Sequence, residues 1–91
     1  MKNLTLLGST GSIGCNTLDV IRRHAEKYRV FALVAGQNAE LLAAQILEFH
    51  PQVAVVATED ALGNLRTRLQ HAGLPRAEWP ELGWGPQARG R

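Results

Sequence analysis

Cysteine, net charge and long apolar runs are all scarce in this 91-residue chain. The single cysteine, Cys15, excludes a disulfide bond within the chain and fits a reducing compartment. No apolar run approaches the roughly 18 residues that a membrane-spanning helix requires. The net charge is only +2, and much of the excess lies in Arg76, Arg89 and Arg91, near the C-terminus. We therefore expect neither a membrane protein nor a nucleic-acid-binding protein.

The composition is that of a folded protein, with 45% hydrophobic and 20% charged residues. Its length allows one small domain or a piece of a larger one. The first residues do not show the pattern of a signal or transit segment, because a strand-like pattern begins at Lys2 or Asn3. We expect a cytoplasmic location.

Short apolar segments alternate with amphipathic segments up to Gly73. The apolar segments, typical of strands in a covered parallel sheet, are residues 3–7, 30–35 and 53–57. The amphipathic segments have helical spacing and cover residues 13 to about 28, 39 to about 49, and the stretch from Thr58 to Gly73. Asn38 and Thr58 are suited to be N-caps. The order β-α-β-α-β-α predicts a Rossmann-like α/β fold, half of a doubly wound parallel sheet with right-handed crossovers.

Residues 74–91 have a different character. They contain three prolines, three glycines and both tryptophans, without a sustained period. We expect a partial nucleotide-binding domain over residues 1–73, followed by an irregular or disordered tail over 74–91 without a fourth strand. The alternative for this tail is an aromatic docking segment built on Trp79 and Trp84. In either case the sheet would stop halfway, as in a truncated chain.

Three glycines, Gly8, Gly11 and Gly14, are spaced by three residues between the first strand and the first helix. A turn into a helix N-terminus presents free backbone N–H groups and a partial positive charge, which together bind anions. Gly11 and Gly14 take the second and third glycine positions of the dinucleotide-binding fingerprint, whereas Gly8 is displaced from the first. The hydroxyl groups of Thr10 and Ser12 add donors. The loop predicts a diphosphate site; the alternative is a tight turn with no ligand.

The end of the second strand indicates which coenzyme would bind. In NAD-binding proteins an acidic residue at this place binds the ribose 2′-hydroxyl group. Residues 33–38 contain no Asp or Glu, and Gln37 and Asn38 offer amide donors instead. The sequence therefore favours NADP over NAD.

The remaining reactive side chains have structural explanations. Cys15 lies in the first turn of the first helix, where a small buried residue is favoured over a reactive thiolate. His24, His50 and His71 stand near three different helix ends, where they complement the helix dipole, and their spacing matches no metal motif. Asp19 is expected to be solvated on its helix. We expect no metal-ligating residue.

Several motifs resemble the N-terminus of the 1-deoxy-D-xylulose 5-phosphate reductoisomerase family. They are GSTGSIG at residues 8–14, TLDV at 17–20, LVAGQN at 33–38 and the LEF-x-P segment at 47–51. The resemblance runs from Met1 to about Gly73 and leaves out the tail. It implies an NADPH-dependent enzyme of isoprenoid biosynthesis that makes 2-C-methyl-D-erythritol 4-phosphate from a phosphosugar substrate, 1-deoxy-D-xylulose 5-phosphate. The full-length family enzyme uses a divalent metal, Mg or Mn, and is expected to be a homodimer.

The same resemblance assigns cofactor-binding residues to two segments. Around the diphosphate and nicotinamide side these are Gly8, Thr10, Gly11, Ser12, Ile13 and Gly14, and around the adenosine 2′-phosphate they are Gly36, Gln37 and Asn38. Many relatives have Lys in place of Gln37, which implies weaker phosphate affinity here. The family's metal-binding and substrate-binding residues correspond to positions beyond residue 91. No catalytic or metal residue is therefore assigned, and no turnover is expected from this chain alone.

Two alternatives belong to other classes. An extended short-chain dehydrogenase or epimerase also has a spaced-glycine loop, but it needs a Tyr-x-x-x-Lys pair. The only tyrosine here is Tyr28, and the residue four positions later is Ala32 instead of Lys. The other alternative is a non-catalytic nucleotide-binding or oligomerising fragment. In that case the bare edge of the first strand would pair with another chain.

Overall fold

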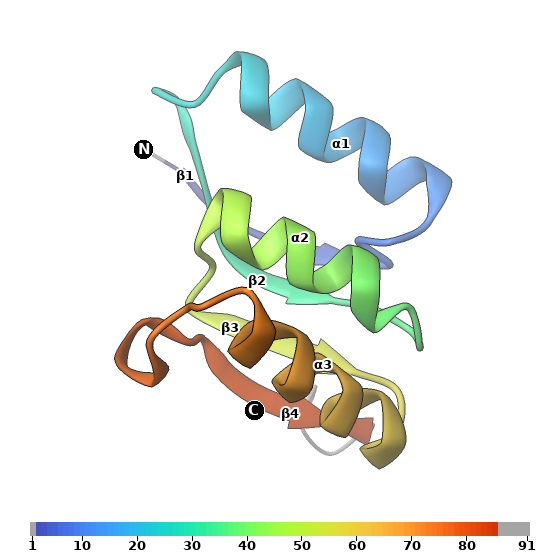
Figure 1. Cartoon of the computed structure of the whole chain (residues 1–91). Coiled ribbons are helices and arrows are strands. Elements are labelled where there is room, and N and C mark those ends of the chain that lie inside the picture. Colours follow the sequence, from blue (N-terminus) through green and yellow to red (C-terminus); the bar gives the residue numbers. More distant parts are fainter. Residues whose placement is uncertain (1, 86–91) are drawn as a thin grey trace.

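The computed structural model describes residues 2–85, which form a four-stranded parallel sheet with helices on one face (Figure 1). The strands lie in the order β1-β2-β3-β4. β1, β2 and β3 are each followed by a helix. The elements in chain order are β1 (Lys2–Leu7), α1 (Ser12–Arg23), β2 (Tyr28–Val34), α2 (Ala39–Phe49), β3 (Val53–Val56), α3 (Glu59–His71), the 3₁₀ turn η1 (Arg76–Glu78) and β4 (Glu81–Trp84).

The hydrophobic core lies between the sheet and the three helices. Each helix contributes an apolar stripe, and the side chains of Leu33, Leu42, Ile46, Leu65 and Leu69 are almost completely buried. On the described residues, the opposite face of the sheet has no helix over it (Figure 1). The predicted Rossmann-like parallel architecture is therefore confirmed.

Two helices begin at the predicted N-caps. The side-chain oxygen of Asn38 accepts a hydrogen bond from the Leu41 N–H at 3.1 Å, and the hydroxyl oxygen of Thr58 accepts one from the Ala61 N–H at 3.2 Å. Glu59 and Asp60 occupy the first turn of α3, where negative charge stabilises the helix dipole. These local signals predicted the starts of both helices correctly.

The first helix is shorter than predicted. It ends at Arg23, and residues 24–27 form a turn in which the Lys27 N–H donates to the His24 carbonyl at 2.9 Å. Tyr28 is therefore the first residue of β2, which pairs with β1 from Lys2 onward. The prediction failed because Tyr28 fits the helical spacing, whereas pairing with β1 determines where the second strand begins.

The fourth strand corrects the prediction of an irregular tail. Residues 81–84 pair in parallel with residues 53–56, so the sheet continues past Gly73, and these four residues form a strand instead of irregular structure. Trp79 packs against the core and its indole N–H donates to the Leu74 carbonyl at 2.9 Å, whereas Trp84 is 45% exposed. The part of the predicted tail over residues 86–91 lies outside the described residues.

β1 is an edge strand of the sheet even though β4 is present. Because the chain crosses the sheet in one direction, β4 adds beside β3, and within residues 2–85 no strand pairs with the outer edge of β1. The last residue of β1, Leu7, is 74% exposed.

None of the helices in the described range is both long and apolar enough to cross a membrane.

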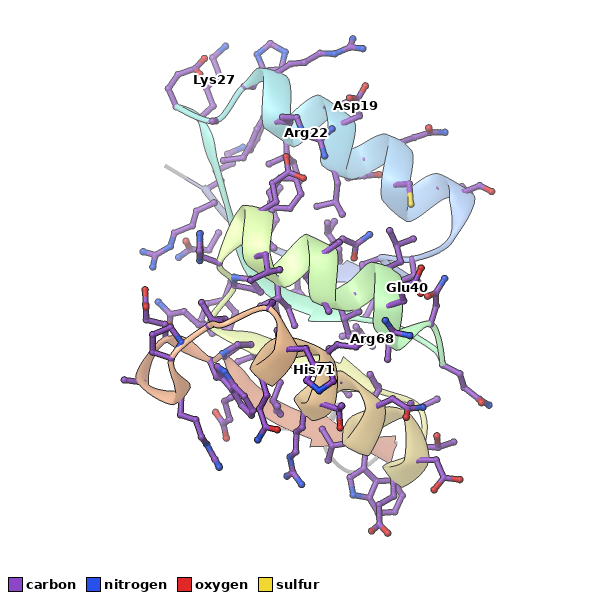
Figure 2. All side chains as sticks on the ribbon, in the orientation of Figure 1. Asp19, Arg22, Lys27, Glu40, Arg68 and His71 are labelled. Atoms are coloured by element: carbon purple, nitrogen blue, oxygen red, sulfur yellow. The ribbon has the colours of Figure 1, made fainter. Side chains whose placement is uncertain are left out.

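Ion pairs connect neighbouring helices. Arg22 of α1 donates to both carboxylate oxygens of Glu48 on α2, with the Nη2 to Oε1 distance at 2.8 Å. Asp19, predicted to be only solvated, accepts from Arg22 at 3.1 Å and pairs with Arg23, and it lies beside Arg22 on α1 (Figure 2). The hydrogen bonds from Arg22 lower the pKa of the Glu48 carboxyl group below its ordinary value of 4.5.

Glu48→Gln is expected to remove a small, acid-sensitive contribution to stability. Because the pKa of Glu48 is lower in the folded state, its stabilisation is present above about pH 4.5 and is lost as the pH falls through the lower, folded-state value. Urea unfolding should show the variant slightly less stable at pH 7 and equal to the unmutated chain at low pH. Glu26→Gln, in the exposed 24–27 turn, is the control. A stability difference that does not change with pH would contradict the expectation.

Candidate functional site

The loops after β1, β2 and β3 lie at the same end of the sheet (Figure 1). They meet there because the strands are parallel, and Leu7, Val34, Val55 and Gly83 form one row across the sheet. In open α/β sheets, ligands bind outside the carboxyl ends of the strands. A cavity of about 330 Å³ opens at this end, lined by Leu7, Gly8, Val34, Ala35, Gly36, Val56, Ala57 and Gly85.

The glycine loop is anchored to β2 at its start. Gly8 has a φ of +70°, a conformation that side chains disfavour, and its N–H donates to the Val34 carbonyl at 2.7 Å. The Ser9 N–H donates to the same carbonyl at 3.0 Å, and the Gly11 N–H donates to the Gly8 carbonyl at 3.0 Å. The loop therefore leaves the sheet in a sharp turn and delivers Gly11 as the N-cap of α1.

Gly14 is essential for the packing of this turn. A Cβ atom at this position would lie 2.2 Å from the Gly8 carbonyl oxygen and 2.7 Å from the Ser9 Cα atom. Both contacts are with backbone, which cannot move aside as a flexible side chain can. The third glycine thus allows the helix to pack closely against the loop, as its fingerprint position predicts.

The N-terminus of α1 has the unpaired donors that an anion requires. Within residues 2–85, no hydrogen-bond acceptor is found for the backbone N–H groups of Thr10, Ser12, Ile13 and Gly14, whereas the Cys15 N–H donates to the Gly11 carbonyl at 2.9 Å. Gly11, Ser12 and Ile13 are exposed, and the Ile13 side chain is 83% exposed. These amides and the helix dipole suit a phosphate or diphosphate group.

The second predicted segment lies beside the first at the same end of the sheet. The Ala35 N–H donates to the Val55 carbonyl at 2.8 Å, and the Gly36 carbonyl accepts from the Ala57 N–H at 3.0 Å. Gly36, Gln37 and Asn38 are exposed. The side-chain oxygen of Asn38 is engaged in the N-cap, so its amide NH₂ is the group left for a ligand.

The sequence did not indicate the roles of two buried polar residues, Ser9 within the glycine loop and Gln45 on α2 beneath it. Ser9 is completely buried and Gln45 is 6% exposed. The Gln45 side-chain amide, on α2, donates to the Ser9 carbonyl at 2.7 Å. The signal in the sequence was a polar residue within the apolar stripe of α2, three residues after Leu42 and one before Ile46.

The described residues do not fit a metal ion. Among residues 2–85 no group of three His, Cys, Asp or Glu side chains is close enough to hold one. The three histidines lie at the ends of three different helices, as predicted: His24 and His50 are C-caps and His71 is the last residue of α3. Cys15 is half-buried, with its thiol 3.8 Å from the Ser9 carbonyl oxygen.

Comparison with known proteins identifies relatives along nearly the whole chain. The family model for 1-deoxy-D-xylulose 5-phosphate reductoisomerase matches residues 4–81. The enzyme of that name from Solibacter usitatus is 60% identical over 89 residues, which cover 98% of this chain. The similarity therefore extends past Gly73, where the sequence-based resemblance was expected to end.

Solved structures agree with the family match. A crystal structure of DOX-P reductoisomerase in complex with magnesium superimposes with a TM-score of 0.84 at 33% identity, over 97% of this chain. Another, in complex with NADPH, fosmidomycin and magnesium, gives a TM-score of 0.83 at the same identity and coverage. The chain spans only 20–22% of the length of these proteins. It belongs to the 1-deoxy-D-xylulose 5-phosphate reductoisomerase family.

Proposed function

We propose that this chain is the NADPH-binding N-terminal portion of a 1-deoxy-D-xylulose 5-phosphate reductoisomerase. The observation that carries the proposal is the set of N–H groups at Thr10, Ser12, Ile13 and Gly14 that have no acceptor within residues 2–85. They belong to the loop whose first residue, Gly8, lines the cavity at the carboxyl ends of the strands. The coenzyme diphosphate lies against these amides. In a complete enzyme of this family the coenzyme would supply the hydride that reduces the substrate. A similar structure was solved in complex with NADPH.

The exposed segment 36–38 binds the adenosine end of the coenzyme. Gln37 and the NH₂ group of Asn38 donate hydrogen bonds to the 2′-phosphate, and the absence of Asp and Glu from residues 33–38 avoids electrostatic repulsion. Glu40, the nearest acidic residue in the sequence, points toward Arg68 of α3, 3.4 Å away (Figure 2). This pairing offsets the negative charge near the phosphate site.

In a complete enzyme the reaction converts 1-deoxy-D-xylulose 5-phosphate to 2-C-methyl-D-erythritol 4-phosphate, with a divalent metal such as Mg or Mn. The described residues offer no metal-ligand group. We therefore assign coenzyme binding to this chain and expect no turnover when substrate, NADPH and Mg²⁺ are added to it alone. A complete enzyme would be a cytoplasmic homodimer.

Thermal unfolding of the 91-residue chain tests this function. We expect NADPH to raise the midpoint of unfolding more than NADH at equal concentration. Both coenzymes carry the diphosphate, but only NADPH has the 2′-phosphate that contacts residues 36–38. Equal protection by the two coenzymes would refute the 2′-phosphate site. An absence of protection by either would refute coenzyme binding altogether.

Gln37→Lys is expected to bind NADPH about three- to tenfold more tightly than the unmutated chain, because a charged donor to phosphate is stronger than a neutral one. The affinity for NADH should stay unchanged, which makes NADH the internal control. Titration of coenzyme fluorescence measures both constants. A similar gain for both coenzymes would show that residue 37 does not contact the 2′-phosphate.

A second candidate function is self-association through β1. This strand lies at the sheet edge within the described range, and Leu7 at its end is 74% exposed. Size-exclusion chromatography with light scattering distinguishes the possibilities. A stable monomer at high concentration would argue against association through this edge.

A further inference from the structure

The peptide unit between Ser9 and Thr10 is held from below by α2. The Ser9 carbonyl oxygen accepts a hydrogen bond from the Gln45 Nε2 atom at 2.7 Å, across 36 residues of sequence. The Cys15 thiol lies 3.8 Å from the same oxygen and is a weak second donor. Ser9 is completely buried and Gln45 nearly so, so this carbonyl points into the protein.

The geometry of the peptide bond links this buried contact to the surface. In a trans peptide unit the C=O and N–H bonds point in opposite directions, and residues 2–85 contain no cis peptide bond. With the Ser9 oxygen directed toward Gln45, the N–H of Thr10 must point away from the interior. That N–H is one of the unpaired donors beside the N-terminus of α1.

The Gln45 amide is the principal donor to a buried carbonyl oxygen. Its Oε1 atom is buried and has no hydrogen-bond partner within the described residues, and the same is true of the neighbouring Ser9 Oγ atom. An apolar side chain at position 45 would remove the unpartnered Oε1 atom but would also take the 2.7 Å donor away from the Ser9 carbonyl. The specific work of this amide is therefore to hold the Ser9 carbonyl in its inward orientation.

We infer that Gln45 is a positioning residue for the coenzyme diphosphate, and this inference rests on the proposed function. By fixing the Ser9 carbonyl inward, it keeps the Thr10 N–H directed toward the ligand. Gln45 itself lies on the opposite side of the loop from the ligand and does not touch it. Its contribution is to align a donor before the coenzyme arrives.

Gln45→Met tests the role, because methionine has a similar length and no donor. We expect the affinity for NADPH to fall about tenfold, because one hydrogen bond to a charged group is no longer aligned. The affinity for adenosine 2′-monophosphate, which has no diphosphate, should stay unchanged. A merely structural role would weaken both ligands together. Gln70→Met, at an exposed position of α3, is the matched control and should change neither affinity.

NMR of the free chain separates this inference from the proposed function. In the Gln45→Met variant the ¹³C′ resonance of Ser9 should move upfield, because the carbonyl no longer accepts the side-chain hydrogen bond. Should the variant not fold, the unmutated chain still tests the contact: the Gln45 Nε2 protons should exchange slowly with solvent and those of Gln70 rapidly.

An unchanged Ser9 resonance, or rapid exchange at Gln45, would overturn the positioning role whether or not NADPH binds. If the Ser9 resonance shifts as expected but the affinities for NADPH and adenosine 2′-monophosphate fall equally, the positioning role is overturned as well. If the unmutated chain shows the NMR signatures and yet binds no NADPH, the proposed function fails and takes the positioning role with it, although the Gln45 contact stands.

Discussion

Gly14→Ala should strongly destabilise the folded chain. The added Cβ atom would lie 2.2 Å from the Gly8 carbonyl oxygen and less than 3 Å from two backbone atoms of Ser9. Relief requires α1 to move away from the loop, which breaks the packing of Leu18 and Ile21 in the core. We expect the free energy of unfolding to fall by about 3 kcal/mol or more, a large share of the stability of a small domain. Urea unfolding followed by circular dichroism measures the loss.

Gly63→Ala provides the control for this prediction. Gly63 lies in the interior of α3, and beyond the local helix backbone no atom of residues 2–85 would lie within 4 Å of a Cβ atom there. Alanine should therefore stabilise the chain, by up to about 1 kcal/mol, through its higher helix propensity. If Gly14→Ala proved as stable as the unmutated chain, the close packing of α1 on the glycine loop would be wrong.

Gly11→Ala should have the opposite profile, with the fold retained and coenzyme binding lost. Gly11 has a φ of −82° and a ψ of 174°, which alanine adopts freely. Among the described residues, an added Cβ would approach only the Gly8 oxygen, at 3.4 Å, apart from its own chain neighbours. The diphosphate is proposed to lie against the backbone at Gly11, the N-cap of α1, so an added methyl group should keep the phosphate from approaching closely. We expect stability to fall by no more than about 1 kcal/mol and the dissociation constant for NADPH to rise at least about tenfold.

Calorimetric titration with NADPH measures the effect at Gly11, with Gly63→Ala as the folded control that binds normally. Unchanged affinity in Gly11→Ala would show that the phosphate does not approach the backbone at this residue. Loss of the fold would show that Gly11, like Gly14, has a packing role. The two glycines thus separate the structural and ligand-binding requirements of one loop.

The parts of the fold that depend on neighbours in the sequence were predictable. Asn38 and Thr58 each cap a helix through an N–H three residues later, so the signal and its effect lie within one turn. The strand β4 was not predictable from the sequence. Glu81–Trp84 becomes a strand by pairing with β3, and four residues that include a glycine show no clear alternation of apolar and polar side chains. The end of α1 likewise depends on the pairing of Tyr28 with Lys2.

The candidate site likewise has a part that the sequence predicted and a part that only the structure shows. The glycine spacing predicted the loop, since Gly8 does adopt a positive φ and Gly14 leaves no room for a side chain. Gln45 could not be assigned, because its contact with Ser9 joins residues 36 positions apart. Sequence patterns locate backbone that must be free of side chains; a structure is needed to find what holds that backbone in place.

We propose above that main-chain amides at the start of α1 bind the coenzyme diphosphate. Titration of the ¹⁵N-labelled chain with NADPH, followed by amide NMR, tests it most directly. We expect the largest shifts at Thr10, Ser12, Ile13 and Gly14, with smaller shifts at residues 36–38. Resonances of these four amides that stay in place at saturating NADPH, or shifts confined to other surfaces, would contradict it.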